Sequence, residues 1–186
     1  MITLAMLWLP ILLSAVFVFI ASSILHMALP IHKADYRGLP DEANVRATIR
    51  NAKAAPGQYM FPHANSMKEC SSPEMIKKQN EGPVGVLILR QNGQVNMGKL
   101  LGQWFVFSIL VSVVVAYLPD IALAPGAGGV FRFTATAALL AYGFSDANNS
   151  IWKGVPWDVA LRFIFDGVVY ALVTGATFAW LWPAAV

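Results

Sequence analysis

The fold is decided by the stretch from Trp157 to Trp182, WDVALRFIFDGVVYALVTGATFAWLW, which is followed by Pro183. A helix of about 20 apolar residues crosses the hydrocarbon core of a bilayer, and this stretch is long enough. It nevertheless carries Asp158, Arg162 and Asp166. A charged side chain at the bilayer centre costs at least roughly 2.5–3.5 kcal/mol, so each of these groups needs a partner. The stretch therefore predicts a membrane helix with one polar face.

The composition of the whole chain also indicates a membrane protein. Of its 186 residues, 57% are hydrophobic and only 12% are charged. Soluble domains carry about 25% charged residues, so the excess of apolar side chains must face something other than water.

Three further apolar stretches predict helices that cross the membrane. The four predicted spans are 2–29, ended by Pro30; 100–118, ended by Pro119; the Ala-rich 130–145, prolonged through Trp152; and 157–182. Pro10 predicts that the first helix either kinks or begins there. This span lacks a basic start and is too long for a signal peptide, so we expect a retained anchor. Residues 119–129, with GAGG at 126–129, predict a flexible loop.

The distribution of basic residues predicts the orientation. Between Lys33 and Lys99 lie ten of the 13 Lys and Arg residues but only six of the ten Asp and Glu residues. Cytoplasmic loops are enriched in Lys and Arg, so this segment is expected inside and both termini outside. Nucleic acid is not an expected partner, because no basic stripe is interleaved with aromatic residues.

The segment between the first two spans is expected to form a small subdomain. Residues 39–57 and 71–80 have the charge pattern and caps of two short helices, with Ser72 capping the second. Asn92-Gly93 between two extended runs predicts a hairpin. The predicted fold class is an all-α membrane protein, a four-helix transmembrane bundle with a cytoplasmic α+β insertion. Its parts are helix 1 (1–30), the insertion (31–98) and helices 2–4 (99–186).

A polar stripe on the last span is the candidate functional feature. Asp158, Arg162, Asp166 and Tyr170 recur every four residues and lie on one helix face. We predict that Arg162 and Asp166 pair with each other, with Asp146 as an additional partner, because an arginine can serve two carboxylates. The stripe is either a network that fixes the helix register or the lining of an ion, proton or head-group site.

Three small residues beside the stripe predict close helix packing. Gly167, Ala171 and Gly175 form a small-xxx-small ridge, which allows another helix to approach. The partner helix belongs either to the same chain or to a second copy.

The sequence predicts no metal site, no cofactor and no catalytic motif. His26, His32, His63 and Cys70 could hold a soft metal, but none of them shows a recognisable ligand spacing. Motifs of nucleophilic, nucleotide-binding and metalloprotease sites are missing.

Several segments resemble an uncharacterised family of small bacterial inner-membrane proteins. They are HKADYRGLPDE, PGQYMFPH, GPVGVLIL, GQWFVFS, SIWKGVPW and FDGVVYALVTGATFAWLWP, which together cover most of the chain. The resemblance implies the inner membrane of a bacterium and no particular activity.

Three classes of function remain open from the sequence. The first is a non-enzymatic scaffold or accessory subunit that packs against copies of itself or a larger membrane complex. The alternative is a small transporter or channel that uses the polar stripe. The third is a membrane enzyme of lipid or quinone chemistry.

Overall fold

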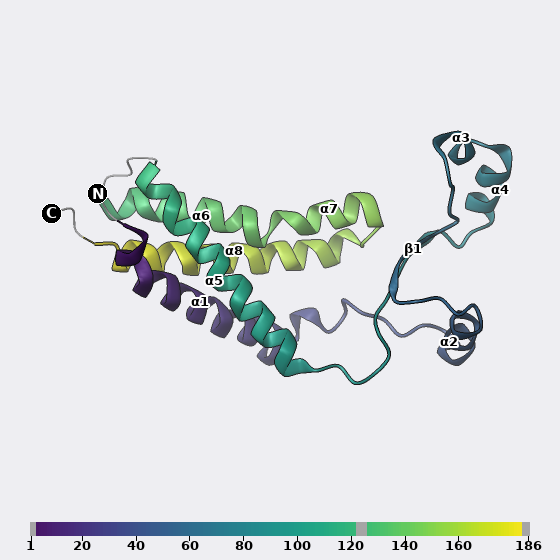
Figure 1. The fold of residues 1–186 in the computed structure, drawn as a ribbon, viewed down its shortest axis with the longest axis horizontal. Coiled ribbons are helices and arrows are strands. Elements are labelled where there is room, and N and C mark those ends of the chain that lie inside the picture. Colours follow the sequence, from purple (N-terminus) through teal and green to yellow (C-terminus); the bar gives the residue numbers. More distant parts are fainter. Residues whose placement is uncertain (1–2, 122–125, 184–186) are drawn as a thin grey trace. The chain divides into compact units, whose positions relative to one another are not determined.

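The computed structural model describes residues 3–121 and 126–183. The chain divides into two compact units. The helical unit contains Met1–Asp35, Asn96–Ile151 and Val155–Val186, and the insertion unit contains Tyr36–Val95 with Trp152–Gly154. Figure 1 shows both units along the chain.

Within residues 3–121 and 126–183, three helical segments are long and apolar enough to cross a membrane: Leu4–Ala28, Met97–Leu118 and Trp157–Leu181. The first is built from a 3-10 turn (η1, Leu4–Leu7), α1 (Trp8–Ser23) and a π-helical turn (η2, Ile24–Ala28). Pro10 lies in the first turn of α1, which fits a helix start there. The second segment belongs to α5 (Met97–Ile121), which continues past Pro119, and the third is α8 (Trp157–Leu181). The candidate span ends at Leu118, as predicted, whereas the helix itself continues for one further turn to Ile121.

The predicted third span is divided into two helices. The first is α6 (Gly126–Tyr142), and after a turn at Gly143 the chain continues as α7 (Phe144–Lys153). With 17 residues, α6 lies at the lower limit of the about 17–25 residues that cross a bilayer. The GAGG sequence forms the start of α6, so the prediction of a flexible turn there was wrong. A loop for 122–125 lies outside the described residues.

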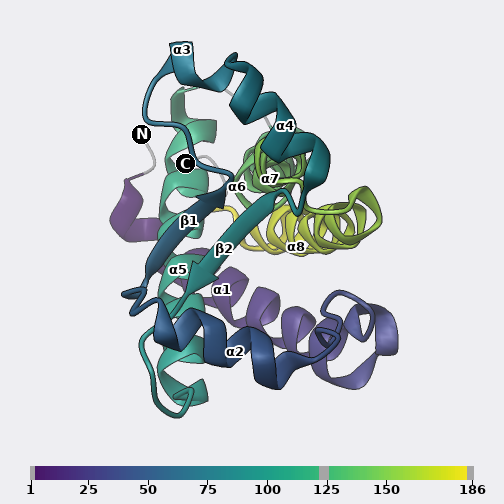
Figure 2. The same cartoon turned by 90° about the vertical axis from the view of Figure 1, so that its right-hand side faces the viewer.

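The small-residue ridge of α8 packs inside the chain. In the helical unit α8 contacts α1 and α6, and α5 also contacts α1 and α6. Figures 1 and 2 show α6 and α8 side by side. A Cβ atom at Gly167 would lie only 2.5 Å from the Gly143 Cα, and one at Gly175 would lie 2.8 Å from the Ala135 Cβ. The absence of side chains at these glycines lets the two helices meet, as the ridge predicts.

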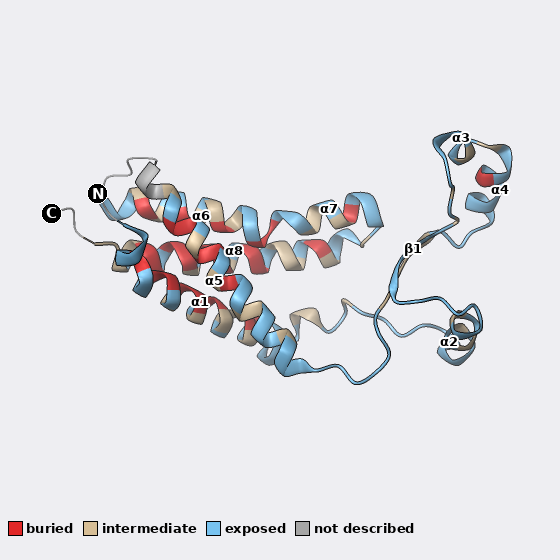
Figure 3. Ribbon diagram, viewed as in Figure 1, coloured by how far each residue is buried: buried red, intermediate tan, exposed pale blue. Residues whose placement is uncertain are grey.

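The buried side chains of the helical unit include many polar groups. In Figure 3 the buried residues line the sides of α1, α6 and α8 that face one another. Buried positions recur every four residues on α6 (Val130, Thr134, Ala138, Tyr142) and on α8 (Asp166, Tyr170, Thr174, Phe178). The polar stripe of α8 therefore faces protein from Asp166 to Thr174, whereas Asp158 at its start is exposed.

The insertion unit contains two predicted helices and a strand pair. The helices α2 (Glu42–Asn51) and α4 (Pro73–Glu81) form where the sequence predicts them, and a short α3 (Met67–Cys70) precedes α4. The Ser72 side chain caps α4 by accepting a hydrogen bond from the Met75 backbone N–H at 3.2 Å. Antiparallel strands β1 (Gly57–Phe61) and β2 (Gly85–Leu89) pair with Gly57 opposite Leu89, as Figure 2 shows.

The strand pairing differs from the predicted hairpin. The partner of β2 is β1, a segment without any extended signal in the sequence, and Asn92-Gly93 does not join two strands. The residues after this dipeptide lead into α5, and the Asn96 side chain accepts a hydrogen bond from the Lys99 N–H at 2.9 Å. Because Asn96 caps α5, the second arm of the predicted hairpin is not free to form a strand.

Candidate functional site: a histidine–carboxylate cluster

A break in the chain after the first helical segment brings two histidines together. His26 lies in the π-helical turn η2, closed by a hydrogen bond of 3.0 Å from the Leu29 N–H to the Ile24 carbonyl. Leu29 is extended, and Pro30 begins a 3-10 turn (η3, Pro30–His32) that ends at His32. The imidazole rings of His26 and His32 therefore stack with centroids 4.1 Å apart. Single π-helical turns occur frequently at functional sites.

Asp166 of α8 faces both histidines. Its Oδ2 lies 3.1 Å from His26 Nε2 and 2.9 Å from His32 Nε2. The Asp166 side chain is 2% exposed and His32 is 10% exposed, while His26 is 37% exposed. Despite these short distances, His32 Nε2 and both Asp166 oxygens have no hydrogen-bond partner among the described residues. Buried polar atoms are almost always hydrogen-bonded, so these three require an explanation.

Asp35 connects His32 to Arg162. Its Oδ2 lies 2.6 Å from His32 Nδ1, and its Oδ1 accepts a hydrogen bond of 2.6 Å from Arg162 Nε. Burial would raise the pKa of the Asp35 carboxyl, but the hydrogen bonds from His32 and Arg162 outweigh burial and hold this pKa below its usual range. Asp35 is therefore a carboxylate, and His32 must donate its Nδ1 hydrogen to it.

The predicted Arg162–Asp166 pair is not formed. In the described part of the chain, Arg162 forms ion pairs with Asp35 and, through Nη2, with Asp158 at 3.0 Å. Neither Asp166 nor Asp146 is its partner. The prediction of mutual pairing was therefore wrong, because a carboxylate from the segment after the first span competes for the guanidinium.

A cavity of about 350 Å³ reaches Asp166. Aromatic residues of three helices form much of its wall, with Trp104 5.9 Å from Tyr142 and Tyr142 5.6 Å from Tyr170, measured between ring centroids. The cavity is lined by His26, Trp104, Phe107, Ala141, Tyr142, Ser145, Asp146, Phe163, Asp166 and Tyr170.

The candidate residues from the sequence thus separate into three groups. Asp146, Asp166 and Tyr170 line the cavity, and Arg162 and Asp158 form ion pairs beside it. Gly167 and Gly175 support the packing of α8 on α6, and Ala171 is buried on the same helix.

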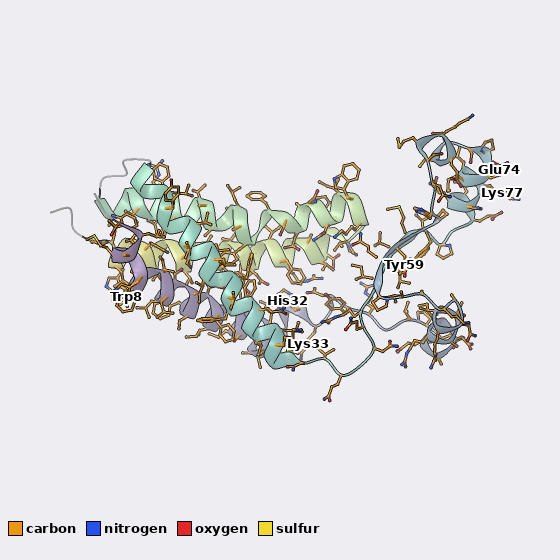
Figure 4. All side chains as sticks on the ribbon, in the orientation of Figure 1. Trp8, His32, Lys33, Tyr59, Glu74 and Lys77 are labelled. Carbon is orange, nitrogen blue, oxygen red and sulfur yellow. The ribbon has the colours of Figure 1, made fainter. Side chains whose placement is uncertain are left out.

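Sequence reasoning missed His26, His32 and Asp35 as members of one site. Their spacing fits no regular helix or known ligand motif, because the chain changes direction at Leu29 and Pro30. The signal that could have found them is a proline between two histidines at the end of a membrane helix. His32 is labelled in Figure 4 in the segment after α1.

Comparisons with protein-family models, with curated proteins and with solved structures find no match to this chain.

Proposed function

We propose that the protein is a small membrane transporter for cations and that its polar path passes Asp166. The observation that carries this proposal is the cavity of about 350 Å³ that reaches a buried carboxylate within a helix able to cross a membrane. Ionisable groups inside membrane helices mark ion pathways when they face a cavity. If the polar residues served only to fix the register of the helices, a direct Arg162–Asp166 ion pair without a cavity beside it would be expected instead.

The charge of the cluster supports a cation as the substrate. The three carboxylates of Asp35, Asp158 and Asp166 and the one guanidinium of Arg162 leave a formal charge of −2 when both histidines are neutral. An uncompensated charge is costly in a medium of low dielectric constant, so the cluster attracts positive ions and repels anions.

Buried hydroxyl groups extend the polar interior beyond Asp166. Ser14 of α1, Ser112 of α5 and Thr174 of α8 are fully buried, and their hydroxyls have no hydrogen-bond partner in the described residues. Groups of this kind can exchange ligands with a passing ion at small cost. They support a path along the helices toward the opposite end of the unit.

Ion flux into liposomes tests the proposal. The purified full-length protein is reconstituted, and uptake of Na⁺, K⁺, Mg²⁺ and Zn²⁺ is followed with fluorescent indicators under an imposed gradient. We expect uptake of at least one of these cations, reduced more than tenfold by Asp166→Asn. Glu74→Gln, a matched change at a carboxylate of the insertion unit labelled in Figure 4, should leave uptake unchanged. Equal uptake by Asp166→Asn and the unaltered protein would refute a path past Asp166, and no uptake of any cation would refute transport.

An accessory-subunit role is a second candidate, supported by an apolar groove between α1 and α8. The groove has a volume of about 520 Å³ and is lined by Phe17, Ile20, Ala21, Ile24, Val173, Ala176, Thr177 and Trp180. Such a groove accepts either lipid chains or a helix of another subunit. Purification in mild detergent followed by mass spectrometry distinguishes the two, because only an accessory subunit retains a partner chain or a second copy.

The topology proposed with this function has four spans in a bacterial inner membrane and both termini outside. The start of α1 and the end of α8 lie at the same end of the helical unit, which supports an even number of crossings (Figure 1). Reporter fusions at Gly57 and Val186 test it, and a cytoplasmic C-terminus would overturn it.

A further inference from the structure

We infer that His26, His32 and Asp166 bind a divalent transition-metal cation, with Zn²⁺ as the representative ion. The inference rests on the transport function proposed for the same site and names its substrate class. One ligand atom from each of the three residues lies within 4.8 Å of the other two, so a single ion can contact all three.

The two distances from Asp166 to the histidines are close to those between the ligands of a zinc ion. Ligand atoms bound tetrahedrally at about 2.0–2.1 Å from Zn²⁺ are about 3.3 Å from one another. Asp166 Oδ2 lies 3.1 Å from His26 Nε2 and 2.9 Å from His32 Nε2. An outward shift of a few tenths of an ångström therefore makes room for the ion between them.

The hydrogen bonds around His32 direct its second nitrogen at the ion. The Asp35 carboxylate lies 2.6 Å from His32 Nδ1, so Nδ1 donates to Asp35 and Nε2 is the nitrogen left for an ion. Nε2 faces the Asp166 carboxylate at 2.9 Å. A cation between them would bind both atoms and give a partner to buried polar atoms that have no hydrogen bond in the described residues.

Asp35 and Arg162 form the outer layer that a metal-binding histidine requires. Histidine ligands of zinc usually donate their other N–H to a carboxylate, which fixes the ring and raises its basicity. Asp35 does this for His32, and the Arg162 Nε–H, 2.6 Å away, fixes Asp35 in turn. Asp35 is a positioning residue for His32.

The ligand types select the metal. Two imidazole nitrogens and one carboxylate suit zinc and its first-row neighbours, whereas Mg²⁺ and Ca²⁺ prefer six or more oxygen ligands. Three protein ligands also leave the fourth position open toward the cavity, because His26 and Asp166 both line it. An open position allows the ion to enter and leave, as a transported ion must.

Metal binding is tested on the purified full-length protein in detergent, after removal of metals with a chelator. Zn²⁺ is titrated in competition with a chromophoric chelator, and Co²⁺ is titrated while visible absorption is recorded. We expect one tight site per chain, the intense absorption of four-coordinate Co²⁺, and no competition from excess Mg²⁺. Asp166→Asn and His32→Ala should each weaken Zn²⁺ binding more than about 100-fold, beyond the 10–100-fold typical of outer-layer changes.

Two further variants separate this site from adventitious binding and from a purely structural effect. His63→Ala removes an exposed histidine of the insertion unit and should leave affinity and stoichiometry unchanged. Asp35→Asn should weaken Zn²⁺ binding about 10–100-fold and alter the Co²⁺ spectrum, and Asp35→Glu should restore most of the affinity. Circular dichroism establishes that each variant is folded.

The outcomes distinguish this inference from the proposed function. Zinc binding that survives Asp166→Asn, depends on His63, or is matched by Mg²⁺ overturns the inference. Cation uptake without zinc binding also overturns it but leaves transport standing. If zinc binds and this binding is lost in the cluster variants, the inference is supported even when liposomes show no uptake. The absence of uptake then refutes only the transport function.

Discussion

Adding a single methyl group at Gly167 tests how closely α8 packs on the end of α6. The new Cβ would lie 2.5 Å from the Cα and 2.7 Å from the N of Gly143, whereas carbon atoms pack best at about 3.5–4.0 Å. Both neighbours are backbone atoms and cannot rotate away. The two helices must therefore separate by about 1 Å at this point.

The change in the free energy of unfolding of Gly167→Ala is the difference between two opposing contributions. Overpacking a buried contact costs about 1–3 kcal/mol, and a contact with backbone belongs at the upper end of this range. Alanine is favoured over glycine inside a helix by about 1 kcal/mol. Gly167→Ala should therefore lower the free energy of unfolding by about 2 kcal/mol.

The other helical glycines provide matched controls. Gly102 of α5 is exposed, and a Cβ there would meet nothing within 4 Å, so Gly102→Ala should be neutral or stabilising by up to about 1 kcal/mol. At Gly175 the nearest atom is the Ala135 Cβ at 2.8 Å, which is fixed to its backbone, whereas the Phe131 ring at 3.1 Å can shift. The effect of Gly175→Ala should therefore lie between the other two. Unfolding by SDS in mixed micelles, followed by circular dichroism, measures all three. A Gly167→Ala variant as stable as Gly102→Ala would refute the packing argument.

Three further predictions concern the charge network, the cavity and the insertion unit. Replacing Arg162 or Asp35 alone by leucine should lower the thermal unfolding temperature more than replacing both, because each single change leaves an unpaired charge; a double variant that unfolds below both single variants would contradict this. Ser145→Trp should block cation uptake by filling the cavity, whereas Leu140→Trp, at an exposed position away from the cavity, should not; equal uptake by the two variants would show that the cavity is not on the path. Ser72→Ala removes the cap of α4 and should destabilise that helix by about 1 kcal/mol, seen as faster amide exchange in α4, and unchanged exchange would contradict the role of the cap.

The features predicted correctly from the sequence depend on local rules. The bilayer fixes the length of an apolar stretch, so the three described helices that are long and apolar enough to cross a membrane are recognisable from hydropathy alone. Helix caps are equally local, and Ser72 with Pro73 begins α4 as predicted. The four-residue spacing on α8 correctly predicts one common face, because the helix period determines it.

The features predicted wrongly depend on contacts between distant parts of the chain. On α8 alone, Arg162 reaches Asp158 and Asp166 equally well, since each lies four residues away. Asp35, 127 residues distant along the chain, decides the choice, and no local pattern announces it. The same limitation applies to β2, whose partner β1 lies on the other side of α3 and α4 in the sequence.

The choice of partners for Arg162 is itself an argument about function. A chain that needed only a neutral, register-fixing pair could join Arg162 to Asp166 within one helix turn. Instead Asp35 engages the guanidinium, and Asp166 remains buried with its Oδ2 3.1 Å from His26 Nε2 and 2.9 Å from His32 Nε2. A carboxylate inside a membrane helix without an arginine or lysine partner costs at least roughly 2.5–3.5 kcal/mol, which is unfavourable for a scaffold. The same arrangement is what a binding site requires, because an incoming cation recovers that energy when it binds. The buried carboxylate that destabilises the apo fold therefore belongs to the proposed metal site of His26, His32 and Asp166.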